Sequence, residues 1–213
     1  MFTGLIESVC TVRSVRRSGS AMLLSIDLAG LAEESKIGDS IAINGVCLTI
    51  ARLEGGLASF DISAETLAKS TLAKLNASSR VNVERSVRAT DRFGGHFVQG
   101  HIDGTATIKA IDKGGQFADM KFTAEAELLE QMVVKGSVAI DGISLTIVSM
   151  DKNSFTVALI PQTLKETTLG KAKIGDAVNI ETDIIIKTII KQLDKILPQT
   201  QPLTAERLKE LGF

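Results

Sequence analysis

The sequence predicts a mainly β chain in which two small antiparallel barrels of about six strands each are followed by a C-terminal α-helix. Three observations support this fold: an internal duplication, short β-type runs separated by turn residues, and a change to helical hydrophobic spacing after residue 182. The chain has 213 residues, 44% of them apolar, which is enough for two small domains with buried cores.

The duplication is clearest where residues 40–50, SIAINGVCLTI, are compared with residues 137–147, SVAIDGISLTI, because seven of the eleven positions are identical. The same spacing of 97 residues relates Thr66-Leu67 to Thr163-Leu164, and VNVE at Val81 to VNIE at Val178. Near the start, FTGLIE aligns with VQGHID at a spacing of 96. A register that holds through four separate segments indicates a domain duplication, and the unit is far too long for a solenoid repeat.

Within each copy, runs rich in β-branched residues are broken by Asn-Gly or Asp-Gly, the strongest short signal for a β-hairpin. Further turns are predicted at RRSGSA, LEGGLA, DKGGQF and MDKNSF. Short helical inserts are predicted at AETLAKSTLA and PQTLKETTLG, where Thr and Pro begin runs that suit a helix.

The predicted domains are a first barrel over residues 1–87, a linker over 88–95, a second barrel over 96–182, and a C-terminal helix and tail over 183–213. The linker, RATDRFGG, is polar and glycine-rich. In TDIIIKTIIKQLDKIL the apolar residues follow helical spacing, with Thr182 or Asp183 as the N-cap and Pro198 at the end. These apolar residues are Ile186, Ile189, Ile190, Leu193, Ile196 and Leu197. Packing against symmetry-related copies is favoured over a helix lying on a membrane surface.

Composition excludes several classes of partner. With 24 basic and 25 acidic residues and no Trp or Tyr, the chain lacks both the charge and the stacking rings of a nucleic-acid binder. No secretory signal and no run of 18 apolar residues is present, so we expect a cytoplasmic protein that does not enter a membrane. The two isolated cysteines, Cys10 and Cys47, are expected to be reduced thiols rather than a disulfide or a zinc site.

Familiar catalytic motifs are missing: there is no GxxxxGK[ST], HExxH or GxSxG, and GGHFVQGHIDG is not in the context of a dinucleotide site. The only histidines, His96 and His101, lie in that glycine-rich stretch. Each is either a structural histidine at a turn or a residue that moves protons near neutral pH. Five residues apart and without a third ligand, they do not predict a metal site, and on a strand they would point to opposite faces.

Polar side chains alternate on the strands that follow the two predicted hairpin turns. Cys47 and Thr49 share one face of the first strand, and Ser144 and Thr146 share the same face of the second. These groups are either solvated or bonded to a polar ligand.

Taken together, the segments MFTGLIE, NGVCLT, DGISLT, GGHFVQGHIDG, IPQTLKETTLG and VNIE resemble the riboflavin synthase family in order and spacing, over residues 1–186. The resemblance implies two six-stranded Greek-key barrels, a trimerising helix, a homotrimer in the cytoplasm, and an association with lumazine synthase.

It also implies a transferase of riboflavin biosynthesis, in which two molecules of 6,7-dimethyl-8-ribityllumazine react by transfer of a four-carbon unit. The products are riboflavin and 5-amino-6-(D-ribitylamino)uracil, and the family uses no metal and no cofactor. Two alternatives stay open: a related lumazine-binding antenna protein without catalytic activity, and a small flavin-binding barrel from a reductase.

Finally, the resemblance carries over a set of substrate-binding positions. In the first barrel they are Gly4, Leu5, Ile6, Cys47, Leu48, Thr49, Asp61, Ile62, Ser63, Ala64, Glu65 and Thr66. In the second barrel they are Gly100, His101, Ile102, Lys135, Ser144, Leu145, Thr146, Ala158, Leu159, Ile160, Pro161, Gln162 and Thr163.

For the chemistry, we expect His101 to move protons with Ser144 and Thr146. Asp141 and Asp183 are expected to orient or polarise that cluster. Cys47 and Ser40 are expected to assist the ligand of the first barrel.

Overall fold

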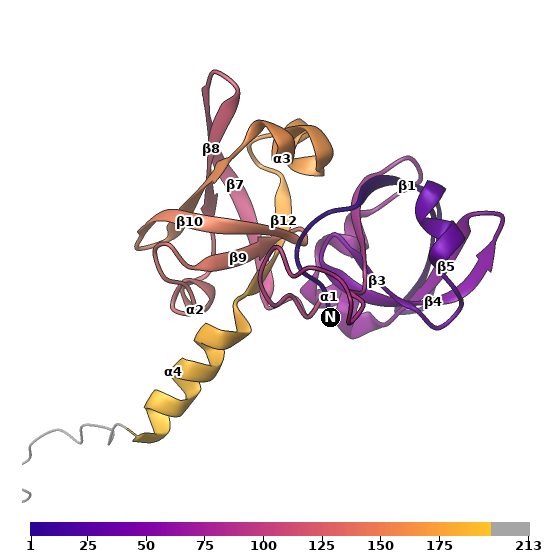
Figure 1. The fold of residues 1–213 in the computed structure, drawn as a ribbon, viewed down its shortest axis with the longest axis horizontal. Helices are drawn as coiled ribbons and strands as arrows, with labels where there is room; N and C mark the ends of the chain where they lie inside the picture. Colours follow the sequence, from indigo (N-terminus) through magenta and orange to yellow (C-terminus); the bar gives the residue numbers. More distant parts are fainter. Residues whose placement is uncertain (197–213) are drawn as a thin grey trace, which may run out of the picture.

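The computed structural model describes residues 1–196 and consists of two closed six-stranded antiparallel barrels that lie side by side, with a helix after the second (Figure 1). This confirms the predicted fold class. The strand order is β1-β2-β5-β4-β3-β6 in the first barrel and β10-β11-β8-β7-β12-β9 in the second. Read around each barrel from its first strand, the two orders are the same, as a duplication requires.

The first barrel occupies the amino-terminal half of the chain. Its strands are β1 Ser8–Ser18, β2 Ala21–Asp27, β3 Ser40–Ile43, β4 Val46–Glu54, β5 Leu57–Ile62 and β6 Arg80–Arg85. Between them lie the short helices η1 Ala29–Glu34, α1 Ala64–Lys69 and η2 Thr71–Lys74.

The second barrel repeats this sequence of elements. Its strands are β7 Gly104–Gly114, β8 Phe117–Thr123, β9 Ser137–Ile140, β10 Ile143–Asp151, β11 Ser154–Leu159 and β12 Ala177–Thr182. Its short helices are α2 Ala126–Leu129, α3 Pro161–Glu166 and η3 Thr168–Lys171. The two inserts predicted from sequence are confirmed as α1–η2 and α3–η3, whereas η1 and α2 were not predicted.

The two hairpin turns have the geometry that their residues suggest. The backbone φ angles are +44° and +78° at Asn44 and Gly45, and +45° and +80° at Asp141 and Gly142. Two successive positive φ angles are typical of the type I′ turn, which matches the twist of the flanking strands. The turns also press against each other, since a Cβ atom on Gly45 would lie 2.7 Å from the backbone nitrogen of Gly142.

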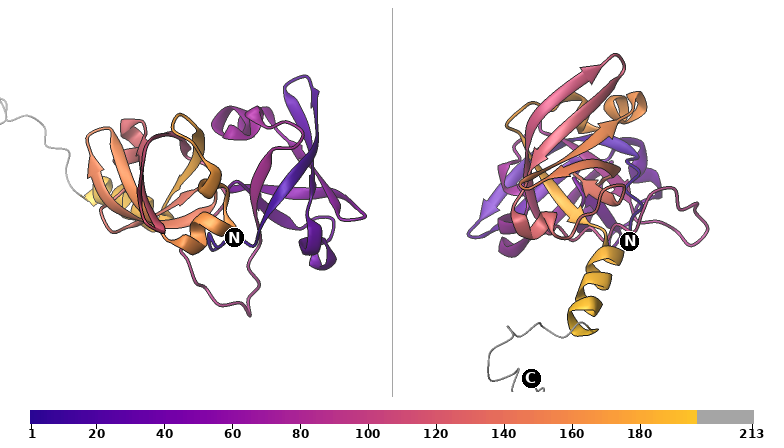
Figure 2. Two further views of the ribbon diagram at one scale, coloured as in Figure 1. Left: turned by 90° about the horizontal axis from the view of Figure 1, so that it is seen from above. Right: turned by 90° about the vertical axis from the view of Figure 1, so that its left-hand side faces the viewer.

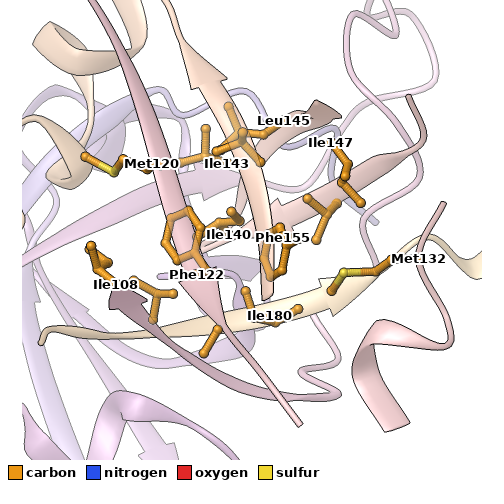
Figure 3. Packing of buried hydrophobic residues seen from close by; sticks show 14 of the residues in the cluster. Ile108, Met120, Phe122, Met132, Ile140, Ile143, Leu145, Ile147, Phe155 and Ile180 are labelled. Atoms are coloured by element: carbon orange, nitrogen blue, oxygen red, sulfur yellow. The ribbon is translucent and has the colours of Figure 1, made fainter. Parts of the chain in front are cut away.

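Each barrel has its own apolar core, built from the inward-facing side of its strands. In the second barrel Phe122 and Phe155 are stacked with ring centroids 5.3 Å apart, surrounded by aliphatic side chains such as Ile140 and Ile180 (Figure 3). Phe60 is fully buried in the corresponding core of the first barrel. Each repeat in the sequence therefore corresponds to one barrel with its own core.

A polar network joins the barrels and follows the same pseudo-twofold relation. Asn82 and Asn179 are fully buried. The side-chain amide of Asn82 donates to the Asp141 carbonyl (3.0 Å), and that of Asn179 donates to the Asn44 carbonyl (2.8 Å). Each amide oxygen in turn accepts a backbone N–H from the other barrel, Thr168 in one case and Thr71 in the other. Because all these groups are paired, the interface fixes how the barrels sit.

Helix α4, Ile184–Ile196, extends away from the second barrel, and neither barrel covers its length (Figure 2). The Asp183 carboxylate accepts the Ile185 N–H at 2.9 Å, which confirms the predicted N-cap. Leu197 and the predicted end at Pro198 lie outside the described residues. Among the helices of residues 1–196, none is long and apolar enough to cross a membrane.

Candidate active site

The polar strips predicted on the two hairpins lie where the sequence placed them. On β4, Val46, Leu48 and Ile50 point into the core, while Cys47 is half-buried and Thr49 is exposed. The strand β10 repeats this pattern, with Ser144 half-buried and Thr146 exposed. Each barrel therefore presents a short polar strip on its outer surface.

Two arms, residues 3–6 and residues 99–102, run along these strips, and each crosses to the opposite barrel. The Gly4 carbonyl accepts the N–H of Ser144 (2.8 Å), and the Gly100 carbonyl accepts the N–H of Cys47 (2.9 Å). Ile6 packs on the core of the second barrel and Ile102 on the core of the first. The arm from the first repeat thus lines the strip of the second barrel, and the arm from the second repeat lines the strip of the first. The prediction that each arm serves its own barrel is wrong, because each arm crosses to the other barrel.

Glycine is required at the point where each arm meets its strip. Gly4 and Gly100 have φ angles of +78° and +83°, which L side chains rarely adopt. A Cβ on Gly4 would lie 2.6 Å from the Cβ of Ser144, and one on Gly100 would lie 2.4 Å from the Cβ of Cys47. Since neither position has room for a methyl group, the arms are seated directly on the strands.

A serine–histidine pair lies on the second barrel, and its histidine is not the one expected. His96 Nδ1 lies 2.7 Å from Ser144 Oγ. Burial lowers the pKa of His96, and the nearby Asp183 charge raises it by less. Nε2 of His96 is buried without a hydrogen-bond partner among residues 1–196. A largely neutral imidazole next to a hydroxyl is suited to accept a proton through it.

His101 lies elsewhere within the chain. Its side chain is exposed, its backbone N–H donates to Glu181 at 3.1 Å, and it sits on the arm beside Cys47. The expected cluster of His101 with Ser144 is therefore not present within one chain. No sequence pattern ranks His96 above His101, because the choice depends on which arm crosses to which barrel.

The segments after β5 and β11 carry most of the remaining predicted binding positions. In the first barrel Ser63 caps α1, since its hydroxyl accepts the Thr66 N–H at 3.2 Å and lies 3.0 Å from the Thr66 hydroxyl. In the second barrel the equivalent of Ser63 is Ile160, which is 53% exposed, and Pro161 begins α3. Of the other predicted positions, Asp61, Ala64, Glu65, Ala158 and Gln162 are exposed, Thr163 is half-buried, and Ile62, Leu159 and Leu145 are buried.

Two further predicted residues flank the strips. Ser40 pairs with Thr49 across β3 and β4 and is half-buried. Lys135 is exposed and has a φ angle of +67°, with its N–H donating to the Ile147 carbonyl. The first repeat has Gly38 at the equivalent position, so the second repeat keeps a lysine in a backbone conformation that favours glycine. Such strain is a reason to look for a functional role of the side chain.

Asp141 lies apart from the serine–histidine pair. Its carboxylate accepts the Asn179 N–H at 2.8 Å, as the Asn44 side chain accepts the Asn82 N–H in the other repeat. Burial raises the pKa of Asp141 to about 7. The expected role of Asp141 in orienting Ser144 thus finds no contact in the structure, and Asp183 is the carboxylate close to His96.

Two cavities, of about 590 and 510 Å³, lie away from most of the predicted binding positions. Leu5 and Ser40 line the first cavity and Asp141 lines the second, but Cys47, Thr49, Ser144 and Thr146 line neither. The polar strips are therefore open surfaces in the single chain. A flat ligand bound there would keep one side uncovered.

Known proteins match the chain over both repeats. The lumazine binding domain family matches the chain twice, over residues 3–86 and 99–183. A riboflavin synthase from Actinobacillus pleuropneumoniae is 41% identical over 216 residues, and one from Bacillus subtilis is 40% identical over 215 residues. Both alignments cover 100% of each chain.

Solved structures with the same fold include LumP complexed with 6,7-dimethyl-8-(1'-D-ribityl) lumazine and LumP complexed with riboflavin. Their TM-scores are 0.78 and 0.79, with 21% and 24% sequence identity, and each covers 85% of this chain and 99% of LumP. With two lumazine-binding repeats and full-length relatives at this level of identity, the chain belongs to the riboflavin synthase family.

Proposed function

We propose that the chain is a transferase that dismutates 6,7-dimethyl-8-ribityllumazine. One lumazine transfers a four-carbon unit to a second, which becomes riboflavin, and the donor leaves as 5-amino-6-(D-ribitylamino)uracil. Donor and acceptor start as the same compound, so the exchange is balanced without an external oxidant or reductant. The observation that carries the proposal is that both repeats have polar side chains on the strip, Cys47 and Thr49 in one and Ser144 and Thr146 in the other.

The crossed arms suggest how each strip would hold a ring. A planar heterocycle on the first barrel would lie beside Cys47, Thr49 and the arm from Gly100 to Ile102. A second ring on the other barrel would lie beside Ser144, Thr146 and the arm from Gly4 to Ile6. Backbone groups next to small residues suit the polar edges of such rings. Holding two rings in register makes the carbon–carbon step local and supplies much of the rate.

The pair of His96 and Ser144 supports a role in removing a proton from the acidic 7-methyl group of a bound lumazine. Because burial keeps His96 largely neutral, it can accept the proton that the Ser144 hydroxyl passes on. The charge of Asp183 would then stabilise the imidazolium that forms. His101, on the arm that lines the strip of the first barrel, would reach this cluster only if a different copy of the chain supplied it.

Helix α4 and the open strips together support a homotrimer. Ile185, Ile189 and Leu193 form an apolar row that is 46–49% exposed. Packing three copies through this row would cover it, and would allow the first barrel of one copy to face the second barrel of the next. The two rings would then react between copies. The cytoplasmic location and the association with lumazine synthase stay predictions.

The discriminating experiment incubates the purified chain with 6,7-dimethyl-8-ribityllumazine alone and follows riboflavin absorbance. Turnover supports the proposal. Tight binding of lumazine without riboflavin formation would instead indicate a binding protein, the second candidate, which the shared fold with ligand-bound LumP makes worth testing.

A further inference from the structure

Two buried glutamates lie at equivalent places in the repeats. Glu84 on β6 is 4% exposed and Glu181 on β12 is 2% exposed, and they are 97 residues apart. Among residues 1–196 neither carboxylate forms an ion pair. A carboxylate that is buried without a counter-ion is stabilised only by hydrogen bonds. The donors around each carboxylate therefore indicate which segment of the chain it holds in place.

All of these donors come from the two arms. Glu84 accepts the Thr3 N–H (2.6 Å), the Thr3 hydroxyl (2.7 Å) and the Gly4 N–H (3.0 Å). Glu181 accepts the backbone N–H groups of Gln99 (2.6 Å), Gly100 (2.9 Å) and His101 (3.1 Å). Each carboxylate therefore fixes the backbone of one arm at its glycine, Gly4 or Gly100, and at the residue before that glycine.

The arm that each glutamate holds then lies against the strip of the opposite barrel. Glu84 belongs to the first barrel, but the carbonyl of Gly4 binds the N–H of Ser144 on the second. Glu181 belongs to the second barrel, but the carbonyl of Gly100 binds the N–H of Cys47 on the first. A substitution of one glutamate should thus alter the position of the arm along the strip of the other barrel.

We propose that Glu84 and Glu181 are positioning residues that act crosswise: Glu84 sets the arm along the Ser144 strip, and Glu181 sets the arm along the Cys47 strip. The inference rests on the proposed function insofar as these strips bind substrate. It assigns to each site a determinant that belongs to the other barrel. A glutamate that merely stabilised its own barrel would have no such selectivity.

The rate of cysteine alkylation measures the accessibility of each strip separately. Cys47 is half-buried whereas Cys10 is buried, so iodoacetamide reports on the first strip in the native chain. The double substitution Cys47→Ser with Ser144→Cys moves the reporter to the equivalent place on the second strip. Glu84→Gln and Glu181→Gln are then made in both backgrounds, with the exposed Glu127→Gln as the matched control. Glutamine keeps the shape but presents an amide N–H₂ to backbone donors.

We expect Glu181→Gln to raise the alkylation rate at position 47 at least fivefold and to leave position 144 within twofold. Glu84→Gln should do the reverse, and Glu127→Gln should change neither rate. The concentration of riboflavin that half-protects each reporter should rise in the same crosswise pattern. Equal changes at both reporters, changes confined to the glutamate's own barrel, or no change would each overturn the inference.

A second pair of variants covers the case in which a glutamine variant does not fold. Gly4→Ala and Gly100→Ala displace the same arms without altering the carboxylates, and they should affect positions 144 and 47 respectively. The alkylation rates without ligand need neither turnover nor lumazine. A chain that shows the crosswise pattern but makes no riboflavin would therefore refute the proposed function and keep the inference.

Discussion

At the scale of single residues, the differences between the two repeats are more informative than their identities. Asn44 and Asp141 occupy the same turn and make the same hydrogen bond to a buried backbone N–H, yet only one of them can ionise. Gly38 and Lys135 occupy the same left-handed position, yet only one carries a side chain. Each difference has a cost in stability that the other repeat avoids, and therefore each predicts a measurable effect.

The first prediction concerns Asp141. Its pKa is about 7 in the folded chain and 3.8 when exposed, so the protonated form is favoured by folding. The stability that this proton confers is present below about pH 4 and is lost as pH rises through about 7. The side chain of the Asp141→Asn variant stays neutral. Between pH 4 and pH 8, its free energy of unfolding in urea should therefore rise by roughly 2–4 kcal/mol relative to that of the native chain.

The reciprocal substitution is the control for Asp141. Asn44→Asp should introduce the same pH dependence into the first repeat, because its side chain occupies the equivalent buried place. A constant stability difference between Asp141→Asn and the native chain across this range would show that folding does not raise the pKa of Asp141.

The second prediction concerns Lys135. Lys135→Gly should raise the free energy of unfolding by about 1 kcal/mol, because glycine adopts the left-handed conformation without strain. The same change should raise KM for lumazine about tenfold or more if the ammonium contacts the ligand. Ser78→Gly is the control, since Ser78 is exposed with a φ angle of +76° and lies outside the strips. It should gain similar stability with KM unchanged, and an unchanged KM in Lys135→Gly would remove the lysine from the site.

The third prediction concerns the pair of His96 and Ser144. His96→Asn should lower kcat roughly 10²- to 10⁴-fold, because asparagine cannot take up the proton. In the native chain the acid limb of the kcat profile should lie below pH 6.5, since burial lowers the histidine pKa, and the variant should lose that limb. Ser144→Ala and the double variant should fall to a similar level because the residues act as one unit. Multiplicative losses would contradict the pairing.

At the scale of elements, most of the fold could be predicted from the sequence, because hairpin turns and short helices are specified locally. The Asn-Gly and Asp-Gly turns, the α1 and α3 inserts and the Asp183 cap all rest on residues close together in the chain. The path of the arms could not be predicted. Gly4 and Gly100 bind strands 140 and 53 residues away, and no local pattern records which barrel an arm crosses to.

Three residues of the site were not predicted from the sequence: Glu84, Glu181 and His96. Glu84 and Glu181 were visible as the last letters of VNVE and VNIE, and a charged residue repeated at the end of a buried strand was a usable signal. His96 gave no such signal, because its importance arises only from the 2.7 Å contact with Ser144.

The fourth prediction belongs to helix α4. Ile189→Glu should convert the proposed trimer into monomers and abolish turnover, since a charge would enter the centre of the apolar row. Lys191→Glu, on the opposite face of the same helix, should change neither property. Sedimentation equilibrium gives the mass of each variant. Full activity in a monomeric Ile189→Glu variant would contradict a site formed between copies.

At the scale of the whole molecule, duplication produces two similar sites, and the crossed arms couple them. Asn82 and Asn179 hold the barrels in one arrangement, while the arms place the wall of each strip under the control of the other barrel. A reaction between two identical molecules suits two related strips that differ in a few groups. Cys47 and Ser144, at equivalent positions, are the clearest such difference within the strips.

The most direct test of this account is the stoichiometry of turnover with lumazine as the only small molecule. We expect two molecules of 6,7-dimethyl-8-ribityllumazine to disappear for each riboflavin formed, with one 5-amino-6-(D-ribitylamino)uracil released, as measured by chromatography of the quenched mixture. Binding of lumazine without loss of lumazine, or riboflavin formation that requires an added cofactor, would contradict it.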